Sequence, residues 1–118
     1  MKRKRLGWIR SSYKDFIAFP EDVQDVMGFS LDMVQCGKKP LNAKPLKGFG
    51  SGVLELMDDH RGKTYRAVYT VRFEDVVYVL HAFQKKSKKG IATPKQDIDL
   101  IKQRLKNAQE LYSAIVKK

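Results

Sequence analysis

Cysteine is almost absent from this chain, since Cys36 is the only one among 118 residues. A single cysteine cannot form a disulfide within the chain, and cytosolic proteins ordinarily lack disulfides. A chain of this length buries roughly two thirds of its unfolded surface in one core, so its fold needs neither disulfides nor a structural metal. We therefore expect one domain over residues 1–118 and a cytoplasmic location.

Long hydrophobic runs are also missing. The basic residues 2–5 resemble the start of a signal peptide, but Arg10, Lys14 and Asp15 interrupt the segment that would have to be apolar. No stretch approaches the roughly 20 apolar residues of a membrane-spanning helix. These absences predict a protein without a secretion signal and without a membrane partner.

The motifs of the common metal- and cofactor-dependent enzymes do not occur. The sequence contains no GxxxxGK[ST] phosphate loop, no GxGxxG after a strand and no HExxH. The two histidines, His60 and His81, and the lone cysteine are not spaced as zinc ligands. We expect no cofactor and no metal.

Acidic residues are scarce and unevenly distributed. The chain carries 24 Lys and Arg against 13 Asp and Glu, a net charge of +11. Residues 1–10 and 35–52 contain no acid, whereas residues 11–34 hold five acids and one lysine. Acid-free blocks attract phosphate backbones, whereas a surface that only confers solubility mixes both signs. Nucleic acid is therefore the leading partner class.

Two helices are predicted in the first third of the chain. Ser12 and Asp15 have the spacing of a capping box, which predicts a helix over residues 13–19. Pro20 favours the first turn of a second helix, which ends before Gly37. The buried face of this second helix is expected to hold Val23, Val26, Met27 and Val34.

Four segments favour β-strands, namely residues 5–10, 53–57, 63–73 and 76–84. Short polar turns join the last three into an antiparallel meander. Alternation along the strand of residues 63–73 places one face in the core and leaves the other partly exposed to solvent. Residues 38–52 contain two Pro and three Gly, which predicts a long loop without a regular element.

A last helix is predicted after Thr93 and Pro94, which suit the N-cap and the first turn. Its apolar residues recur every three or four positions and form one stripe: Ile98, Ile101, Leu105, Ala108, Tyr112 and Ile115. We expect the first half of this stripe to pack on the sheet. The order β-α-α-β-β-β-α predicts an α+β fold with helices against one face of a small, mostly antiparallel sheet.

Basic and aromatic side chains near the strand ends form the candidate site. His81, Phe83 and Lys85 share one parity and project from the same face of their strand. With Arg66 and Lys86 they suit cleavage of RNA by its own 2′-hydroxyl without a metal. The cations would neutralise the phosphorane, the imidazole would transfer protons, and the phenyl ring would stack on a base.

Structural roles for the same residues remain open alternatives. His81 also fits a half-buried strand histidine with satisfied hydrogen bonds, and Phe83 fits the core. Arg66 lies among apolar strand residues and competes as the partner of a structural ion pair with Glu55.

Five short motifs occur in a fixed order along most of the chain. They are PLKGF at 45–49, LEL at 54–56, YRAVY at 65–69, LHAFQKKS at 80–87 and ATP at 92–94. Their order and spacing resemble the phage-derived, HigB-type branch of the RelE/ParE toxin superfamily. The resemblance implies a ribosome-dependent mRNA endonuclease, the toxin of a type II toxin-antitoxin pair. Its implied partners are mRNA on the ribosome and a helix-turn-helix antitoxin encoded by the adjacent gene.

The resemblance also implies roles for individual residues. Arg66 falls where the family places an arginine that acts on the scissile phosphate, and Lys85 or Lys86 falls near the second cation of the site. Lys47 matches the basic position of the Leu-Lys-Gly loop, which implies contact with the RNA backbone. The complete predicted RNA-binding set is Lys44, Lys47, Phe83, Lys88 and Lys89.

Two departures from the family pattern keep other functions open. Met57 stands where many relatives have a basic residue after the Leu-Glu-Leu motif, and residues 87–90 lack the tyrosine of the RelE branch. The general base is therefore unassigned. Some members of the superfamily inhibit DNA gyrase and need no catalytic group, and a non-catalytic phage protein that binds nucleic acid would show the same charge.

Overall fold

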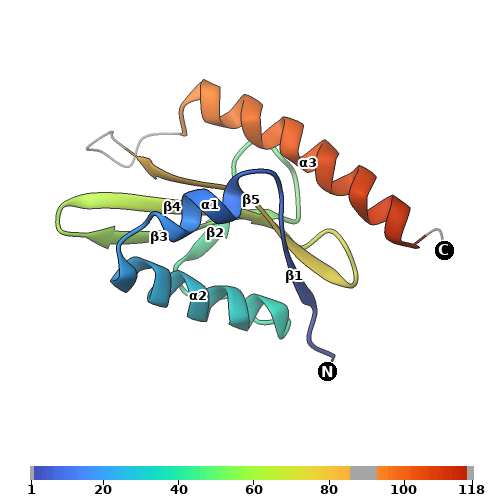
Figure 1. Ribbon diagram of the computed structural model, residues 1–118, viewed down its shortest axis with the longest axis horizontal. Helices are drawn as coiled ribbons and strands as arrows, with labels where there is room; N and C mark the ends of the chain where they lie inside the picture. Colours follow the sequence, from blue (N-terminus) through green and yellow to red (C-terminus); the bar gives the residue numbers. More distant parts are fainter. Residues whose placement is uncertain (1, 86–92, 117–118) are drawn as a thin grey trace.

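The computed structural model describes residues 2–85 and 93–116. They form a five-stranded sheet with three helices packed on it (Figure 1). In chain order the elements are β1 (Arg5–Trp8), α1 (Ser12–Ile17), α2 (Glu21–Gln35), β2 (Ala43–Pro45), β3 (Val53–His60), β4 (Lys63–Thr70), β5 (Val76–Lys85) and α3 (Lys95–Val116). None of the helices in this part of the chain has the length and apolar character that a membrane crossing requires.

The sheet has the strand order β1-β5-β4-β3-β2. Only β1 runs parallel to its neighbour β5, and the other three pairs are antiparallel. The predicted α+β class, the mostly antiparallel sheet and the order of the predicted elements are confirmed. The structure adds one strand, β2, which the sequence did not predict.

Helices cover both faces of the sheet, so the prediction that they pack on one face is wrong. Figure 1 shows α2 on one side of the sheet and α3 on the other. Side chains of both parities on β4 are buried, because Tyr69 packs with α2 residues while Val68 packs with α3 residues. The face of β4 that was expected to be partly exposed to solvent is therefore covered by α3.

The first two helices differ in detail from the prediction. The capping box is wrong, because Ser12 is the first residue of α1 and donates its hydroxyl to the Val79 carbonyl oxygen at 3.0 Å. The bounds predicted for α2 are confirmed. Of its expected buried residues, Val26 is exposed (44%), because it lies on a second apolar face that does not meet the sheet.

The β3–β4 hairpin is longer than predicted. A two-residue turn at Arg61 and Gly62, both with φ above +50°, joins His60 directly to Lys63. The polar residues 58–60 therefore belong to β3, at the solvent-exposed end of the hairpin. At the other end β4 stops at Thr70, and Phe73 packs on Tyr112 of α3 with ring centroids 4.9 Å apart.

The segment predicted to be a long loop contains β2, which pairs with β3 so that Lys44 lies opposite Glu55. The return from β2 to β3 passes Gly52, where φ is +84° and a Cβ atom would lie 2.6 Å from Cγ of Arg72. Only glycine fits this position. The Arg72 guanidinium donates to the Ser51 carbonyl oxygen at 2.8 Å and ties this loop to the sheet.

Two core clusters fill the space between the sheet and its helices. The cluster under α1 and α2 includes Phe16, Met27 and Leu31. The cluster under α3 includes Leu80, Ile101 and Ala108. The apolar stripe predicted for α3 is confirmed over its first half, whereas Ile115 near the end of the helix is 44% exposed.

Candidate functional site

Four charged side chains form a row across adjacent strands on the α3 side of the sheet. They are Lys44 on β2, Glu55 on β3, Arg66 on β4 and Lys85 on β5. Nη1 of Arg66 lies 2.5 Å from Oε1 of Glu55, and Nζ of Lys44 lies 3.8 Å from the same oxygen. This charged row is possible because β2 brings Lys44 beside β3. The ion pair between Arg66 and Glu55, one of the open alternatives, is confirmed.

Three members of the charged row are buried and one reaches solvent. Glu55, Arg66 and Lys85 are 2%, 4% and 5% exposed, whereas the Lys44 side chain is half exposed. Among the described residues, Nζ of Lys85 and Oε2 of Glu55 have no hydrogen-bond partner. Burial lowers the pKa of Lys85, and the positive charges of Arg66 and Lys44 lower it further while Glu55 opposes them. Three cations and one carboxylate in the charged row leave an excess of positive charge that favours an anion.

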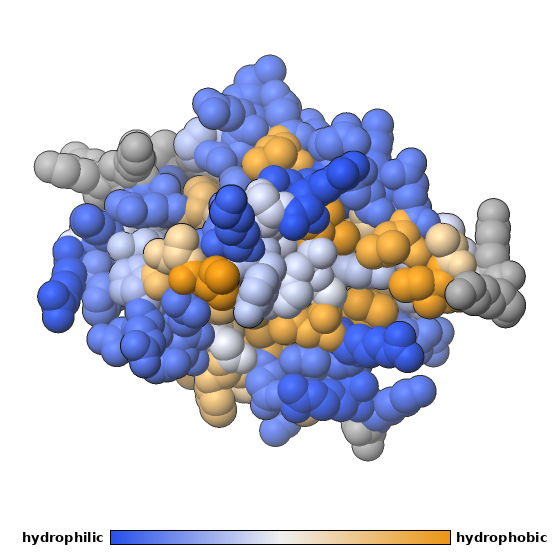
Figure 2. Space-filling model, viewed as in Figure 1, coloured by the Kyte–Doolittle hydropathy of each residue, from blue (hydrophilic) through white to orange (hydrophobic). Residues whose placement is uncertain are grey.

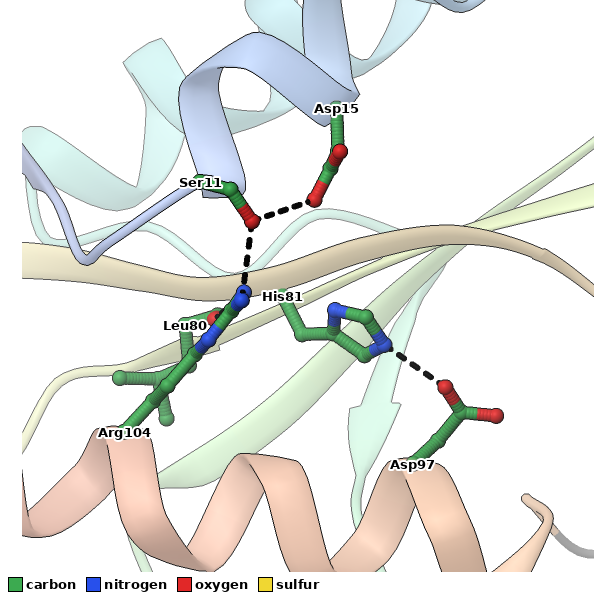
Figure 3. Close-up of polar contacts among 6 residues, drawn as sticks. All are labelled: Ser11, Asp15, Leu80, His81, Asp97 and Arg104. Carbon is green, nitrogen blue, oxygen red and sulfur yellow. Dashed lines mark hydrogen bonds and ion pairs between the residues drawn. The ribbon is translucent and has the colours of Figure 1, made fainter.

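A second group joins β5 to the first turn of α3. Figure 3 shows the His81 ring directed at Asp97, and its Nε2 atom lies 2.8 Å from Oδ1 of that carboxylate. Because a carboxylate only accepts, Nε2 carries a proton, and in the neutral ring Nδ1 is then left with a lone pair. Burial lowers the pKa of His81, although the hydrogen bond to Asp97 opposes this shift. Among the described residues, Nδ1 has no hydrogen-bond partner.

A bulge in β5 sets the direction of the His81 side chain. His81 pairs with Val68 and Val79 pairs with Tyr69, so Leu80 is an extra residue on β5. Leu80 packs in the cluster under α3, and the next residue also points towards that helix. The ring of Phe83 stacks on the imidazole with centroids 4.6 Å apart.

Arg104 fixes α3 to the rest of the fold. Its guanidinium donates to the Leu80 carbonyl oxygen at 3.0 Å and to the Ser11 hydroxyl at 2.9 Å (Figure 3). The Ser11 hydroxyl donates in turn to Asp15 at 2.9 Å. This network holds α3 in the place where Asp97 meets His81.

The structure brings the described candidate residues together in part. Lys44, Arg66 and Lys85 share the charged row, and Phe83 is paired with Arg66 across the strands and stacked on His81. No hydrogen bond or ion pair within residues 2–85 and 93–116 joins His81 to the three cations. Lys47 is exposed in the turn after β2. Lys86, Lys88 and Lys89 lie outside the described residues.

Sequence reasoning missed two residues of the site, Asp97 and Arg104. Both lie beside the predicted apolar stripe of α3, and the spacing 97, 101, 104 and 108 follows one face of a helix. That spacing could have identified both residues from the sequence. In the described part of the chain, no three His, Cys, Asp or Glu side chains gather as metal ligands.

Comparisons with known proteins give a family and a fold. Residues 14–106 match the family described as phage derived protein Gp49-like (DUF891). The free Escherichia coli toxin RelE, in a mutant form, is similar in structure with a TM-score of 0.51 and 20% identity over 68% of this chain and 81% of RelE. This likeness shows the RelE fold.

The toxin-antitoxin complex RelBE2 from Mycobacterium tuberculosis gives a TM-score of 0.48 with 21% identity, over 70% of this chain and 99% of the matched one. A comparison with curated proteins gives no match. The family match confirms the phage-derived part of the predicted resemblance, and the likeness to RelE confirms the fold.

Proposed function

The chain belongs to the Gp49-like family of phage-derived proteins, and from this premise we propose that it is the toxin of a type II toxin-antitoxin pair that cleaves mRNA on the ribosome. The observation that carries the proposal is the charged row, in which Lys44 and Arg66 both lie beside the Glu55 carboxylate and Lys85 is buried within range of their charges. Clustered cations suit the phosphate of an RNA backbone. The sequence match and the RelE fold support the same conclusion.

The reaction we propose is attack by a 2′-hydroxyl on the adjacent phosphate. The oxygen–phosphorus bond to the 2′-oxygen forms, the bond to the 5′-oxygen breaks, and the products carry a 2′,3′-cyclic phosphate and a 5′-hydroxyl. Negative charge grows on the phosphorane oxygens, and the charged row neutralises it. Arg66 binds Glu55 through Nη1 and has no partner on Nε among the described residues, so it has a donor left for a phosphate oxygen.

Two groups of the site are suited to the proton transfers. His81 is neutral because burial lowers its pKa, and its Nδ1 atom is the available base for the proton of the 2′-hydroxyl. Asp97 then stabilises the imidazolium that forms. Lys85, whose pKa is also lowered, is the group we assign to protonate the departing 5′-oxygen.

RNA must gain access to the buried side chains on this face of the protein before the reaction can begin. Arg66 and His81 are only 4% and 6% exposed, whereas Lys44 and Lys47 are exposed. The exposed lysines, with Lys88 and Lys89 in the predicted set, would bind the backbone first. Phe83 is partly buried beside His81. Its ring would then leave the imidazole and stack on a base of the RNA.

Inhibition of DNA gyrase is the second candidate, and one observation favours it. Arg66 and His81 are both held by carboxylates of the chain itself, which is the arrangement expected of structural residues. An inhibitor that acts by binding needs no catalytic group. In that case growth arrest would leave mRNA intact and alter DNA supercoiling.

The proposed partner in the cell is a helix-turn-helix antitoxin encoded by the adjacent gene, and the proposed location is the cytoplasm. The antitoxin is implied by the family resemblance, and the location follows from the proposed ribosomal substrate. Co-expression with the neighbouring reading frame is expected to relieve growth arrest and to yield a stable complex.

The chemistry of the RNA ends tests the proposed reaction. The purified protein is added to a translating extract, and the ends of the mRNA fragments are mapped. We expect 5′-hydroxyl ends and 2′,3′-cyclic or 3′-phosphate ends, with unchanged cleavage at EDTA levels that leave ribosomes intact. Fragments with 5′-phosphate ends, or intact mRNA together with altered supercoiling, would contradict it.

A further inference from the structure

A groove of about 680 Å³ lies beside α2, bounded by the segment before β2 and by the end of β3. Its apolar lining consists of Val26, Phe29, Met33, Pro40, Leu41 and Met57. Phe29 is 68% exposed and Leu41 is fully exposed. Single exposed apolar residues are ordinary on a protein surface, but a lined groove of this kind marks a site of interaction.

The groove uses a second apolar face of α2. Val23, Met27, Leu31 and Val34 of α2 are buried against the sheet. Val26, Phe29 and Met33 follow spacings of three and four residues on a different side of the helix, and Val26 and Phe29 are exposed there. Hydrophobic side chains reach the surface around α2 between hydrophilic ones (Figure 2). The fold therefore uses only one of the two apolar faces.

The edge of the sheet beside this groove is not suited to binding another strand. Asn42 and Leu46 direct their backbone bonds towards β3, so Ala43 and Pro45 face outwards. The Ala43 N–H already donates to the Pro40 carbonyl oxygen at 3.2 Å, and proline has no N–H. The outer edge of β2 thus offers no donor to a further strand, whereas an amphipathic helix can bind an apolar groove through its side chains alone.

Two carboxylates also line the groove beside its apolar residues. Asp25 comes from α2 and Asp58 from β3, and neither forms an ion pair with a described residue. Burial and the neighbouring Asp59 raise the pKa of Asp58, whereas His60 opposes this shift. A cation placed beside either carboxylate would be stabilised.

A second copy of this chain is a poor occupant. Helix α2 carries Glu21, Asp22, Asp25 and Asp32 and no basic residue, so two such helices would bring like charges together. We propose that the groove binds an amphipathic helix of a partner protein, with apolar side chains on one face and Lys or Arg beside them. The groups of the charged row take no part in this binding, so the proposal is independent of RNA cleavage.

A pair of designed peptides tests the proposal. Both are helices of about 18 residues with the same leucine stripe, flanked by Lys in one and by Glu in the other. We expect the Lys peptide to bind the full chain at least tenfold more tightly, as measured by fluorescence anisotropy. This preference is diagnostic because the net charge of +11 favours the Glu peptide in non-specific electrostatic binding.

Variants locate the binding. Phe29→Ser, at an exposed position, is expected to weaken binding of the Lys peptide at least tenfold, whereas Leu111→Ser, an exposed apolar position on α3, leaves it unchanged. Combining Asp25→Lys with Asp58→Lys is expected to reverse the preference between the two peptides. Equal binding of both peptides, or binding unaffected by Phe29→Ser, would overturn the proposal. So would a dimer in sedimentation experiments that Phe29→Ser dissociates, because the occupant would then be a second copy.

Discussion

The two faces of the sheet are built from different kinds of side chain. The core under α1 and α2 is apolar and aromatic. On the α3 face the buried groups include all five charged or imidazole side chains of the described core: Glu55, Arg66, His81, Lys85 and Arg104. Burying charge costs free energy, whereas apolar groups of the same volume would not. Both faces hold an apolar core, but only the α3 face adds buried charge to it, and this is the face on which we propose that RNA is cleaved.

Removal of one partner from the buried ion pair should produce the largest change in stability. Glu55→Leu leaves the Arg66 guanidinium buried without its carboxylate, and we expect a loss of about 3–5 kcal/mol in the free energy of unfolding in urea. The double variant Glu55→Leu with Arg66→Met should recover most of that loss. A single variant as stable as the parent would show that the α3 face is not a buried charged site.

A cavity in the core under α1 and α2 should lower the free energy of unfolding nearly as much. It should leave the rate of mRNA cleavage unchanged. Leu31 is 1% exposed in the cluster under α1 and α2, so Leu31→Ala should destabilise the fold by about 2–5 kcal/mol. The rate of mRNA cleavage per folded molecule should not change. A selective loss of cleavage at full folding would contradict the division between the two faces.

His81 should make stability depend on pH. Because its pKa is lower in the folded protein than the usual 6.5, the unfolded chain takes up a proton first as the pH falls. Stability is therefore expected to decrease below about pH 6.5, by at most about 1.4 kcal/mol per pH unit, until the folded-state pKa is reached. Urea unfolding at several pH values should show this slope in the parent and in His60→Gln but not in His81→Gln. An equal slope in all three proteins would assign the dependence to other groups.

The end of α3 should contribute least to the stability of the fold. Ile115 continues the apolar stripe but is 44% exposed, so Ile115→Ser should change the free energy of unfolding by no more than about 0.5 kcal/mol. Ile101→Ala, at a fully buried position of the same stripe, is the matched comparison and should cost about 2–5 kcal/mol. Equal losses would mean that the last turns of α3 are as well packed as the first.

The features that were predicted from the sequence are those set by local periodicity. The apolar stripe of α3, the span of α2 and the meander of β3, β4 and β5 each follow from spacings within one segment. The Arg66–Glu55 pair could be raised as an alternative because the two residues lie 11 positions apart on neighbouring strands of one hairpin.

The features that were missed depend on contacts between distant segments. Strand β2 has three residues, and only pairing with the edge of β3 makes it a strand. Asp97 and Arg104 find their partners on β5, 16 and 24 positions away, which no local pattern reveals. Val26 was assigned to the core because helical periodicity alone cannot separate one wide apolar face from two narrow ones.

The claim that the α3 face cleaves RNA is tested most directly by Lys85→Met. The substitution keeps the volume and removes a buried charge that has no hydrogen-bond partner among the described residues, so stability should be unchanged or higher. The rate of mRNA cleavage in a translating extract is expected to fall on the order of 10²-fold or more, whereas Lys63→Met, at the exposed end of the hairpin, should cleave as the parent does. Lys85→Met protein that folds and cleaves mRNA at the parental rate would contradict the assignment of the charged row as the site of cleavage.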